Sequence, residues 1–159
     1  MKLMKQTGNR WHYLLNAKEA DCLRVLLDQF PVAALSSSTI TRSDTDPGSV
    51  DREKLLNEAM AEHRAELKRQ AGRLIGTDKF KPADKGLLFC IKAEERERML
   101  QILNDIRIES WRMLGEPEDL EMESSKLPQA NLRYYHFMQL AGFFEHHFLG
   151  PDFSADFAQ

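Results

Sequence analysis

The residues best suited to chemistry gather in one predicted helix, over 93–114. Asn104 and Arg107 are three positions apart, so they lie on adjoining sides of that helix, with Asp105 beside them. Trp111 follows Arg107 by four positions, a spacing that lets a guanidinium stack on an indole ring. In one interpretation, Arg107 binds an anion or carboxylate and Asn104 adds a hydrogen bond. In the other, the Arg107 stem covers apolar surface and its head group pairs with a carboxylate of another element.

Histidines in the predicted last helix, over 129–149, raise the question of a metal site. His146 and His147 point about 100° apart, and His136 shares a face with His147 but lies about 16 Å from it along the helix axis. No two of them have the i,i+4 spacing of a helical metal pair, and there is no HExxH motif. Ligands such as His12 or His63 would have to come from elsewhere, so we predict no metal and no cofactor.

Motifs that mark common enzyme classes are absent from the sequence. It contains no GxGxxG, GxxxxGK[ST], GxSxG or CxxC, and no Cys or Ser stands beside an obvious base. Because catalytic groups often lie far apart along a chain, these absences do not exclude an enzyme. They favour a protein that is not one.

The last helix is also unusual in being apolar on nearly all sides. Its candidate contact residues are Tyr135 and His136 near the start, followed by many large apolar side chains. A helix of this kind is either the centre of its domain or has one flank against another chain. Two interpretations stay open: a core helix, or an interface with another protein or with a second copy in a homodimer.

Length and composition indicate one domain over residues 1–159. Apolar residues make up 42% of the 159 and charged residues 30%, an ordinary globular composition. The net charge is -3, and Lys and Arg are interleaved with Glu and Asp, so we expect no nucleic-acid partner. No apolar run approaches the roughly 20 residues that span a bilayer, and the N-terminus lacks a signal-peptide core, so we expect no membrane association and a cytoplasmic location. The sparse cysteines, Cys22 and Cys90, read as buried free thiols.

The elements that must position these residues form an α+β fold that is predominantly helical. Strands at 2–4 and 11–15 flank a turn at 7–9, and a capping box of Asn16 and Glu19 begins a helix that ends at Pro31. Further helices are predicted at about 49–75, 93–114 and 129–149, and a buried strand at 87–91. We therefore predict a four-helix core with a small antiparallel sheet made of the N-terminal hairpin and the 87–91 strand. Residues 36–49 read as a flexible loop, 77–85 as a polar connection, 116–123 as an exposed acidic segment, and 151–159 as a tail.

One pattern occurs twice in the chain. Residues 13–20 resemble residues 89–96, and Leu23 then matches Met99 at the same offset. Each copy reads as a buried strand, a capping turn and an amphipathic helix. Either a unit is duplicated and its strands share one sheet, or two unrelated segments converge on a common pattern. In both cases the 87–91 strand is expected to join the hairpin, since a lone hairpin is only marginally stable.

Three segments together resemble a known family. Residues 103–108 (LNDIRI), followed by Met113-Leu114-Gly115, resemble the central motif of a bacterial family catalogued as domain of unknown function 2017. Residues 15–20 with Leu23-Arg24 resemble its N-terminal segment, and Tyr135-His136 its C-terminal one. Genes of that family lie near that of the ClpS protease adaptor, so the resemblance implies a loose link to regulated proteolysis. It carries over no catalytic residue.

Two function classes follow. The first is a protein-interaction or regulatory module, supported by the apolar last helix and the missing catalytic motifs. The alternative is a small-molecule or anion-binding protein, which could be an enzyme, using Arg107 in a pocket between helices.

Overall fold

The computed structural model describes residues 1–32, 48–118 and 127–150. Four strands form one antiparallel sheet in the order β1-β2-β4-β3. Their bounds are β1 (Lys2–Thr7), β2 (Arg10–Leu15), β3 (Phe80–Ala83) and β4 (Gly86–Lys92). The helices are α1 (Ala17–Asp28), α2 (Gly48–Leu74), α3 (Ala93–Met113) and α5 (Leu132–Leu149), with short 3-10 turns at Thr77–Lys79 and Gln129–Asn131. The predicted α+β class, with four helices and a small sheet that includes the N-terminal hairpin, is confirmed.

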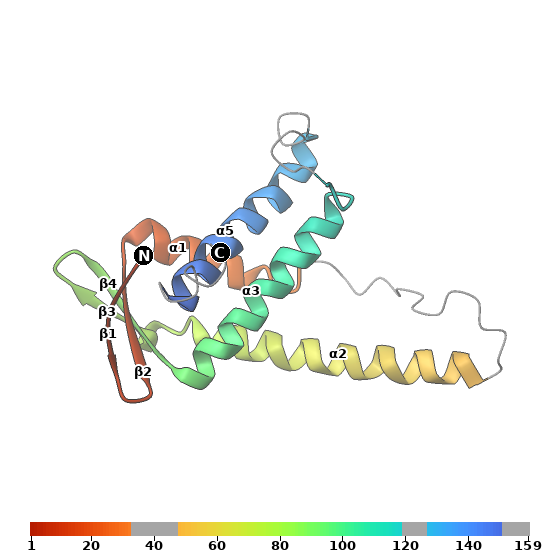
Figure 1. The fold of residues 1–159 in the computed structure, drawn as a ribbon, viewed down its shortest axis with the longest axis horizontal. Coiled ribbons are helices and arrows are strands. Elements are labelled where there is room, and N and C mark those ends of the chain that lie inside the picture. The colour runs from red at the N-terminus through yellow and green to blue at the C-terminus, as the bar shows by residue number, and fades with distance from the viewer. Residues whose placement is uncertain (33–47, 119–126, 151–159) are drawn as a thin grey trace, which may run out of the picture.

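The sheet is built from two ββα units that meet at its centre. The units are β1-β2-α1 and β3-β4-α3, and β2 pairs with β4 antiparallel, with Tyr13 directly opposite Phe89. These two residues occupy the same place in the repeated pattern of the sequence, so a local two-fold axis passes between them. The repeat therefore has a structural counterpart: two similar strand-to-helix segments share one sheet (Figure 1).

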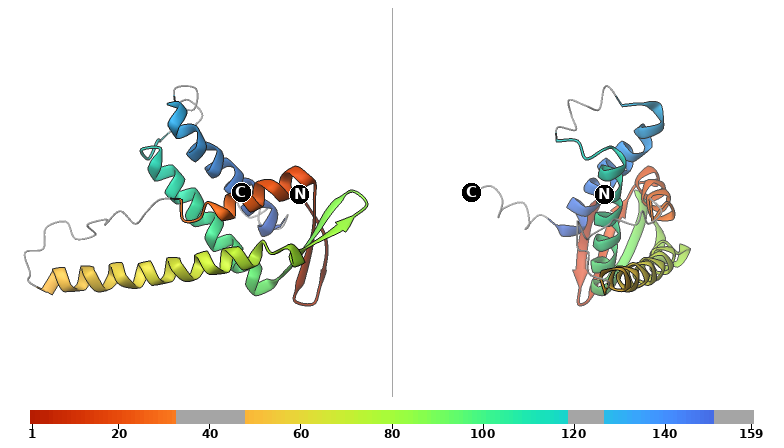
Figure 2. Two further views of the ribbon diagram at one scale, coloured as in Figure 1. Left: turned by 180° about the vertical axis from the view of Figure 1, so that it is seen from behind. Right: turned by 90° about the vertical axis from the view of Figure 1, so that its right-hand side faces the viewer.

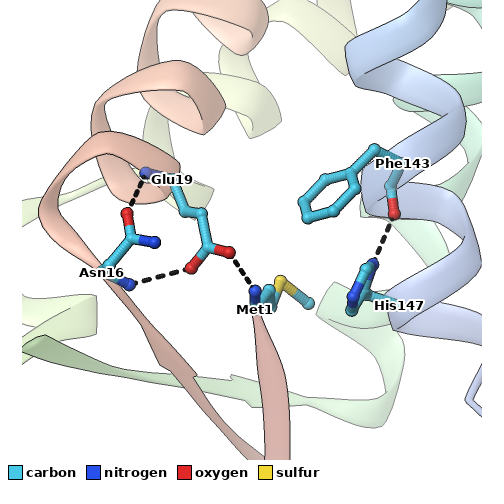
Figure 3. A network of polar contacts seen from close by, with 5 residues as sticks. All are labelled: Met1, Asn16, Glu19, Phe143 and His147. Atoms are coloured by element: carbon cyan, nitrogen blue, oxygen red, sulfur yellow. Dashed lines mark hydrogen bonds and ion pairs between the residues drawn. The ribbon is translucent and has the colours of Figure 1, made fainter. Parts of the chain in front are cut away.

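Both units begin their helix with the same glutamate hydrogen bond. The Glu19 carboxylate accepts from the Asn16 N–H at 2.8 Å, and Glu95 accepts from the Lys92 N–H at 2.9 Å. In the first unit the Asn16 side chain also accepts from the Glu19 N–H at 2.9 Å, which completes the predicted capping box. The second Glu19 oxygen forms an ion pair with the amine of Met1 (Figure 3), so β1 is tied to the start of α1.

The core lies between one face of the sheet and helices α1, α3 and α5 (Figure 1). Alternation along the strands sends Tyr13 and Phe89 into this core. None of the described helices lies on the opposite face of the sheet (Figure 1). The α5 helix runs beside α3, and the Phe148 ring packs edge-on against both Tyr13, at 5.1 Å, and Phe89, at 6.2 Å. Phe148 therefore lies at the local two-fold axis, where the single α5 helix packs against both units.

The α2 helix extends well beyond the other described helices and strands, as seen in Figure 1 and in the left panel of Figure 2, where it lies across the view. Its sequence carries one apolar stripe from Leu56 to Leu74. The C-terminal part of that stripe, including Leu67 and Leu74, is buried against the body, whereas Leu56 is 43% exposed and Met60 37% exposed. The stripe therefore continues past the surface that covers it.

The structure differs from the sequence-based elements in two places. The stretch predicted as a polar connection, 77–85, contains β3, so the sheet has four strands rather than three. The α2 helix begins at Gly48, two residues inside the predicted 36–49 loop. The rest of that loop, most of the acidic segment at 116–123 and the 151–159 tail lie outside the described residues.

Candidate functional site

A cleft of about 440 Å³ opens between the projecting part of α2 and the outer side of α3. One wall is α2 and the other is α3, each with apolar and charged side chains. Its lining residues are Ala59, Met60, His63 and Arg64 from α2, and Asp105, Ile108, Glu109 and Arg112 from α3. Asp105 is the one sequence-predicted candidate that lies in this cleft.

An ion pair forms the floor of the cleft. Glu109 is 5% exposed, and its carboxylate pairs with the Arg64 guanidinium from the facing helix. The other Glu109 oxygen accepts a hydrogen bond of 3.0 Å from the Val32 N–H, which follows α1. One carboxylate thus joins three segments that are distant in sequence, and it fixes the spacing of the two walls.

Asp105 and His63 line the cleft from opposite helices. Burial raises the pKa of Asp105 above its ordinary value, and the positive charges of Arg64 and His63 oppose the rise. A histidine on the apolar face of a helix is expected to be a core or boundary residue rather than a metal ligand, but the His63 side chain is exposed. This part of the α2 stripe extends past the surface that covers the rest of it.

Apolar side chains continue from the cleft across α3. Ile108 is 38% exposed and belongs both to the cleft and to a neighbouring hollow of about 250 Å³, lined by Arg107, Ile108, Trp111 and Met138. The Trp111 ring does not stack on Arg107. Its Nε1 donates to the Pro117 carbonyl at 3.2 Å, which leaves part of the indole facing outward.

Arg107 makes the contacts of a boundary residue. Its guanidinium pairs with the Glu145 carboxylate of α5 at 3.1 Å and donates to the Asn104 side-chain oxygen at 3.1 Å. Burial raises the pKa of Glu145, and the Arg107 charge opposes the rise. Since a carboxylate and an amide already occupy the head group, this geometry favours the structural interpretation of Arg107 over the anion site.

The other two candidates lie elsewhere. Tyr135 and His136 are in the first turns of α5, where their rings contact each other at 5.9 Å, and they do not line the cleft. The α5 helix itself is mostly packed inside: Tyr134, Ala141, Phe144 and Phe148 are buried, and Phe143 and Leu149 are its exposed large apolar residues.

Sequence reasoning missed the residues that make the cleft. Met60 and His63 belong to the apolar stripe of α2, but the sequence pattern alone does not show how much of that stripe another element covers. The pairing of Arg64 with Glu109 could not be inferred from the sequence around either residue, because charged residues are common in helices and these two meet only when α2 packs against α3.

Within the described ranges, no three His, Cys, Asp or Glu side chains are grouped so that they could hold a metal ion. Over the same ranges no helix is both long and apolar enough to cross a membrane. Comparison of the chain with protein-family models, curated proteins and solved structures found no match. The resemblance of residues 103–108 to the family named above therefore stays a prediction.

Proposed function

We propose that this chain is a protein-interaction module that binds an amphipathic helix of another protein in the cleft between α2 and α3. The observation that carries the proposal is the apolar stripe of α2, which is buried at Leu67 and uncovered at Leu56 and Met60. Large apolar side chains exposed in a row on a monomer are typical of a surface that another protein covers.

The shape of the cleft suits a helix. Two helices form its walls, and Met60 on one and Ile108 on the other supply apolar contacts. A helix in a groove is held by anchors at i, i+3, i+4 and i+7 along its apolar face. The charged groups of the cleft, Arg112 and Asp105 among them, would contact the polar flanks of such a helix.

The role of the complex rests on the family resemblance. A link to regulated proteolysis, as a regulatory module that delivers or holds a partner, would follow from the resemblance of residues 103–108 and 15–20 to that family. Binding through the last helix, or to a second copy of the chain, is a different arrangement of the same class of function, and the experiment below separates them.

The test compares three single variants in chemical cross-linking and co-purification from extracts of the source organism. Met60→Glu and Ile108→Glu place a charge on either wall of the cleft. Val25→Glu is the matched control, since Val25 is 56% exposed on α1 and lies outside the cleft. Circular dichroism and unfolding curves establish that each variant folds.

We expect the partner bound by the wild-type chain to be lost with both cleft variants and kept with Val25→Glu. Binding of a purified partner peptide should weaken at least tenfold with either cleft variant, since a buried apolar anchor is worth more than about 1.4 kcal/mol. Light scattering decides whether the occupant is a second copy. A dimer that Met60→Glu dissociates, or a partner that both cleft variants still bind, would overturn the proposal.

A further inference from the structure

A cysteine and a histidine lie directly opposite each other on the open face of the sheet. His12 of β2 pairs in register with Cys90 of β4, and the Cys90 sulfur is 2.8 Å from His12 Nδ1. Both side chains are half-exposed and point to the face that has no helix. Cys90 was expected to be a buried thiol, but strand alternation puts its neighbours Phe89 and Ile91, not Cys90, in the core.

The strand pairing surrounds these two residues with positive charge. In the register, Lys5 lies beside His12. On the same face, the Arg10–Lys92 pair lies next to the His12–Cys90 pair on one side, and Lys81, which pairs with Leu88, lies on the other side. The four described strands contain no acidic residue. Basic residues that are interleaved with acidic ones along the sequence are thus sorted onto one surface by the alternation of the strands.

The same charges set the state of the histidine. Burial lowers the pKa of His12 from its ordinary value, and the charges of Lys5, Arg10 and Lys81 lower it further. His12 is therefore a neutral imidazole near pH 7, able to accept the thiol proton through Nδ1. The surrounding cations would stabilise the negative charge that develops on sulfur when it reacts.

A shallow pocket of about 240 Å³ gives reagents access to this pair. Besides the residues above, it is lined by Asp78, Lys79 and Glu95. The Glu95 carboxylate pairs with Lys79 and also interacts electrostatically with Lys92. Basic side chains still outnumber acidic ones in the lining, four to two, so the surroundings of Cys90 keep a positive excess.

We propose that Cys90 is a redox-modification site, at which the thiol forms a mixed disulfide with small disulfides that carry carboxylates. His12 accepts the proton of Cys90 as the sulfur attacks one sulfur of the small disulfide. The new bond joins Cys90 to that sulfur, the old S–S bond breaks, and the other half leaves as a thiolate that takes up the proton. The two electrons gained by the departing thiolate are those given up in forming the protein disulfide, so no further oxidant is needed.

Cys22 provides a control within the same chain. It is also partly exposed, but it lies on α1 against the apolar core, and no histidine contact to it is found among the described residues. A difference in reactivity between the two thiols therefore reports their surroundings rather than exposure.

The experiment treats the reduced wild-type chain with oxidised glutathione, which is net negative, or with cystamine, a disulfide that is net positive. Mass spectrometry follows the mixed disulfide at each cysteine over time. With oxidised glutathione we expect Cys90 to react about tenfold or more faster than Cys22, a factor typical of steering by a charged cleft. With cystamine the ratio should fall several-fold. Equal rates at the two cysteines with oxidised glutathione, or a larger ratio with cystamine, would overturn the proposal.

Two variants separate the roles of base and charge. His12→Gln should slow the reaction of Cys90 with both disulfides and leave Cys22 unchanged. Lys81→Gln should reduce the preference for the anionic disulfide, and the matched change Lys85→Gln, at an exposed residue between β3 and β4 that does not line the pocket, should not. If Lys85→Gln reduced the preference of Cys90 for the anionic disulfide as much as Lys81→Gln does, the basic residues that line the pocket would not be the source of that preference. The wild-type comparison needs no variant, so it stands even if His12→Gln fails to fold.

Discussion

The Arg64 guanidinium on α2 forms an ion pair with the buried Glu109 carboxylate on α3. Because Glu109 also accepts the Val32 N–H, this carboxylate holds the end of α1 and both walls of the cleft in one arrangement. This carboxylate therefore contributes to the stability of the cleft alongside the apolar packing of Leu67 and Leu74 of α2.

Arg64→Met is expected to lower the free energy of unfolding by about 3 kcal/mol, because it leaves the buried Glu109 carboxylate without this cation. Urea unfolding at neutral pH measures the change. Arg69→Met is the control: Arg69 pairs with Glu66 on the exposed side of the same helix, and its loss should cost far less, because exposed ion pairs contribute little to stability. Similar losses of unfolding free energy for both variants would show that the Arg64–Glu109 ion pair contributes no more to stability than an exposed ion pair does.

Arg107→Met is expected to cost more stability near pH 7 than near pH 4.5. Burial raises the pKa of Glu145, and Arg107 opposes the rise. A carboxyl with a raised pKa contributes stability while it is protonated, and that contribution is lost as the pH rises through the folded-state pKa. Without Arg107 the pKa rises further, so the ionised carboxylate at neutral pH is less well compensated.

Urea unfolding of Arg107→Met at several pH values tests this expectation. In the double variant Arg107→Met/Glu145→Gln the extra cost near neutral pH should disappear, because no carboxylate remains at that position. A cost for Arg107→Met that does not change with pH would mean that Glu145 does not sense this charge.

Arg96→Lys is expected to destabilise the last turn of α5. The Arg96 guanidinium lies 4.2 Å from the centre of the Trp11 ring and donates to the carbonyls of Phe148, at 2.6 Å, and Leu149, at 3.2 Å. A lysine cannot stack and bridge two carbonyls in this way. The expected loss is about 2 kcal/mol, with faster amide exchange at the end of α5. Arg98→Lys, at an exposed site of α3, the helix that carries Arg96, should have neither effect.

Glu19→Gln is expected to cost about 1 kcal/mol near pH 7, the usual value of a helix cap. Burial raises the pKa of Glu19, but hydrogen bonds from the Met1 amine and the Asn16 N–H outweigh burial, and the net shift is downward. Such a carboxyl contributes stability above its ordinary pKa and loses that contribution as the pH falls through the folded-state value. The penalty of Glu19→Gln in thermal unfolding should therefore shrink on acidification, as that of Arg107→Met does, but at lower pH, because the pKa of Glu19 is lowered whereas that of Glu145 is raised.

Gly86→Ala is expected to weaken the centre of the sheet by more than about 2 kcal/mol. Gly86 has a φ of 139°, and a Cβ there would lie 2.2 Å from the Leu15 carbonyl oxygen, which is backbone and cannot move aside. Gly72→Ala, where a Cβ would meet nothing within 4 Å, should instead stabilise α2 by about 0.5–1 kcal/mol. Differential scanning calorimetry should show opposite shifts in the two melting temperatures.

Local signals in the sequence sufficed for much of the fold. The Asn16 and Glu19 pair marked the start of α1, and the repeat of residues 13–20 at 89–96 led to the correct prediction that the 87–91 strand joins the N-terminal hairpin. The β3 strand was missed because FKPA has no clear alternation and contains Pro82, which a sheet accepts only at an edge such as this one.

The candidate sites depend on contacts that a sequence does not display. The pairing of Arg107 with a carboxylate was foreseen as one of two interpretations, but its partner, Glu145, lies on another helix. The His12 and Cys90 pair exists only because β2 and β4 are neighbours in one particular register; a shift of one residue would turn Cys90 into the core.

The pairing of β2 with β4 also constrains the order in which the chain can assemble. Leu15 faces Leu87 in the sheet, so the N-terminal hairpin remains without its central neighbour until the second unit has been synthesised. At about 5–20 residues per second, a ribosome needs roughly 4–15 s to cover that interval. During this time the apolar side of β2 has only α1 against it, so the nascent first unit is the part of this protein that we expect chaperones to bind.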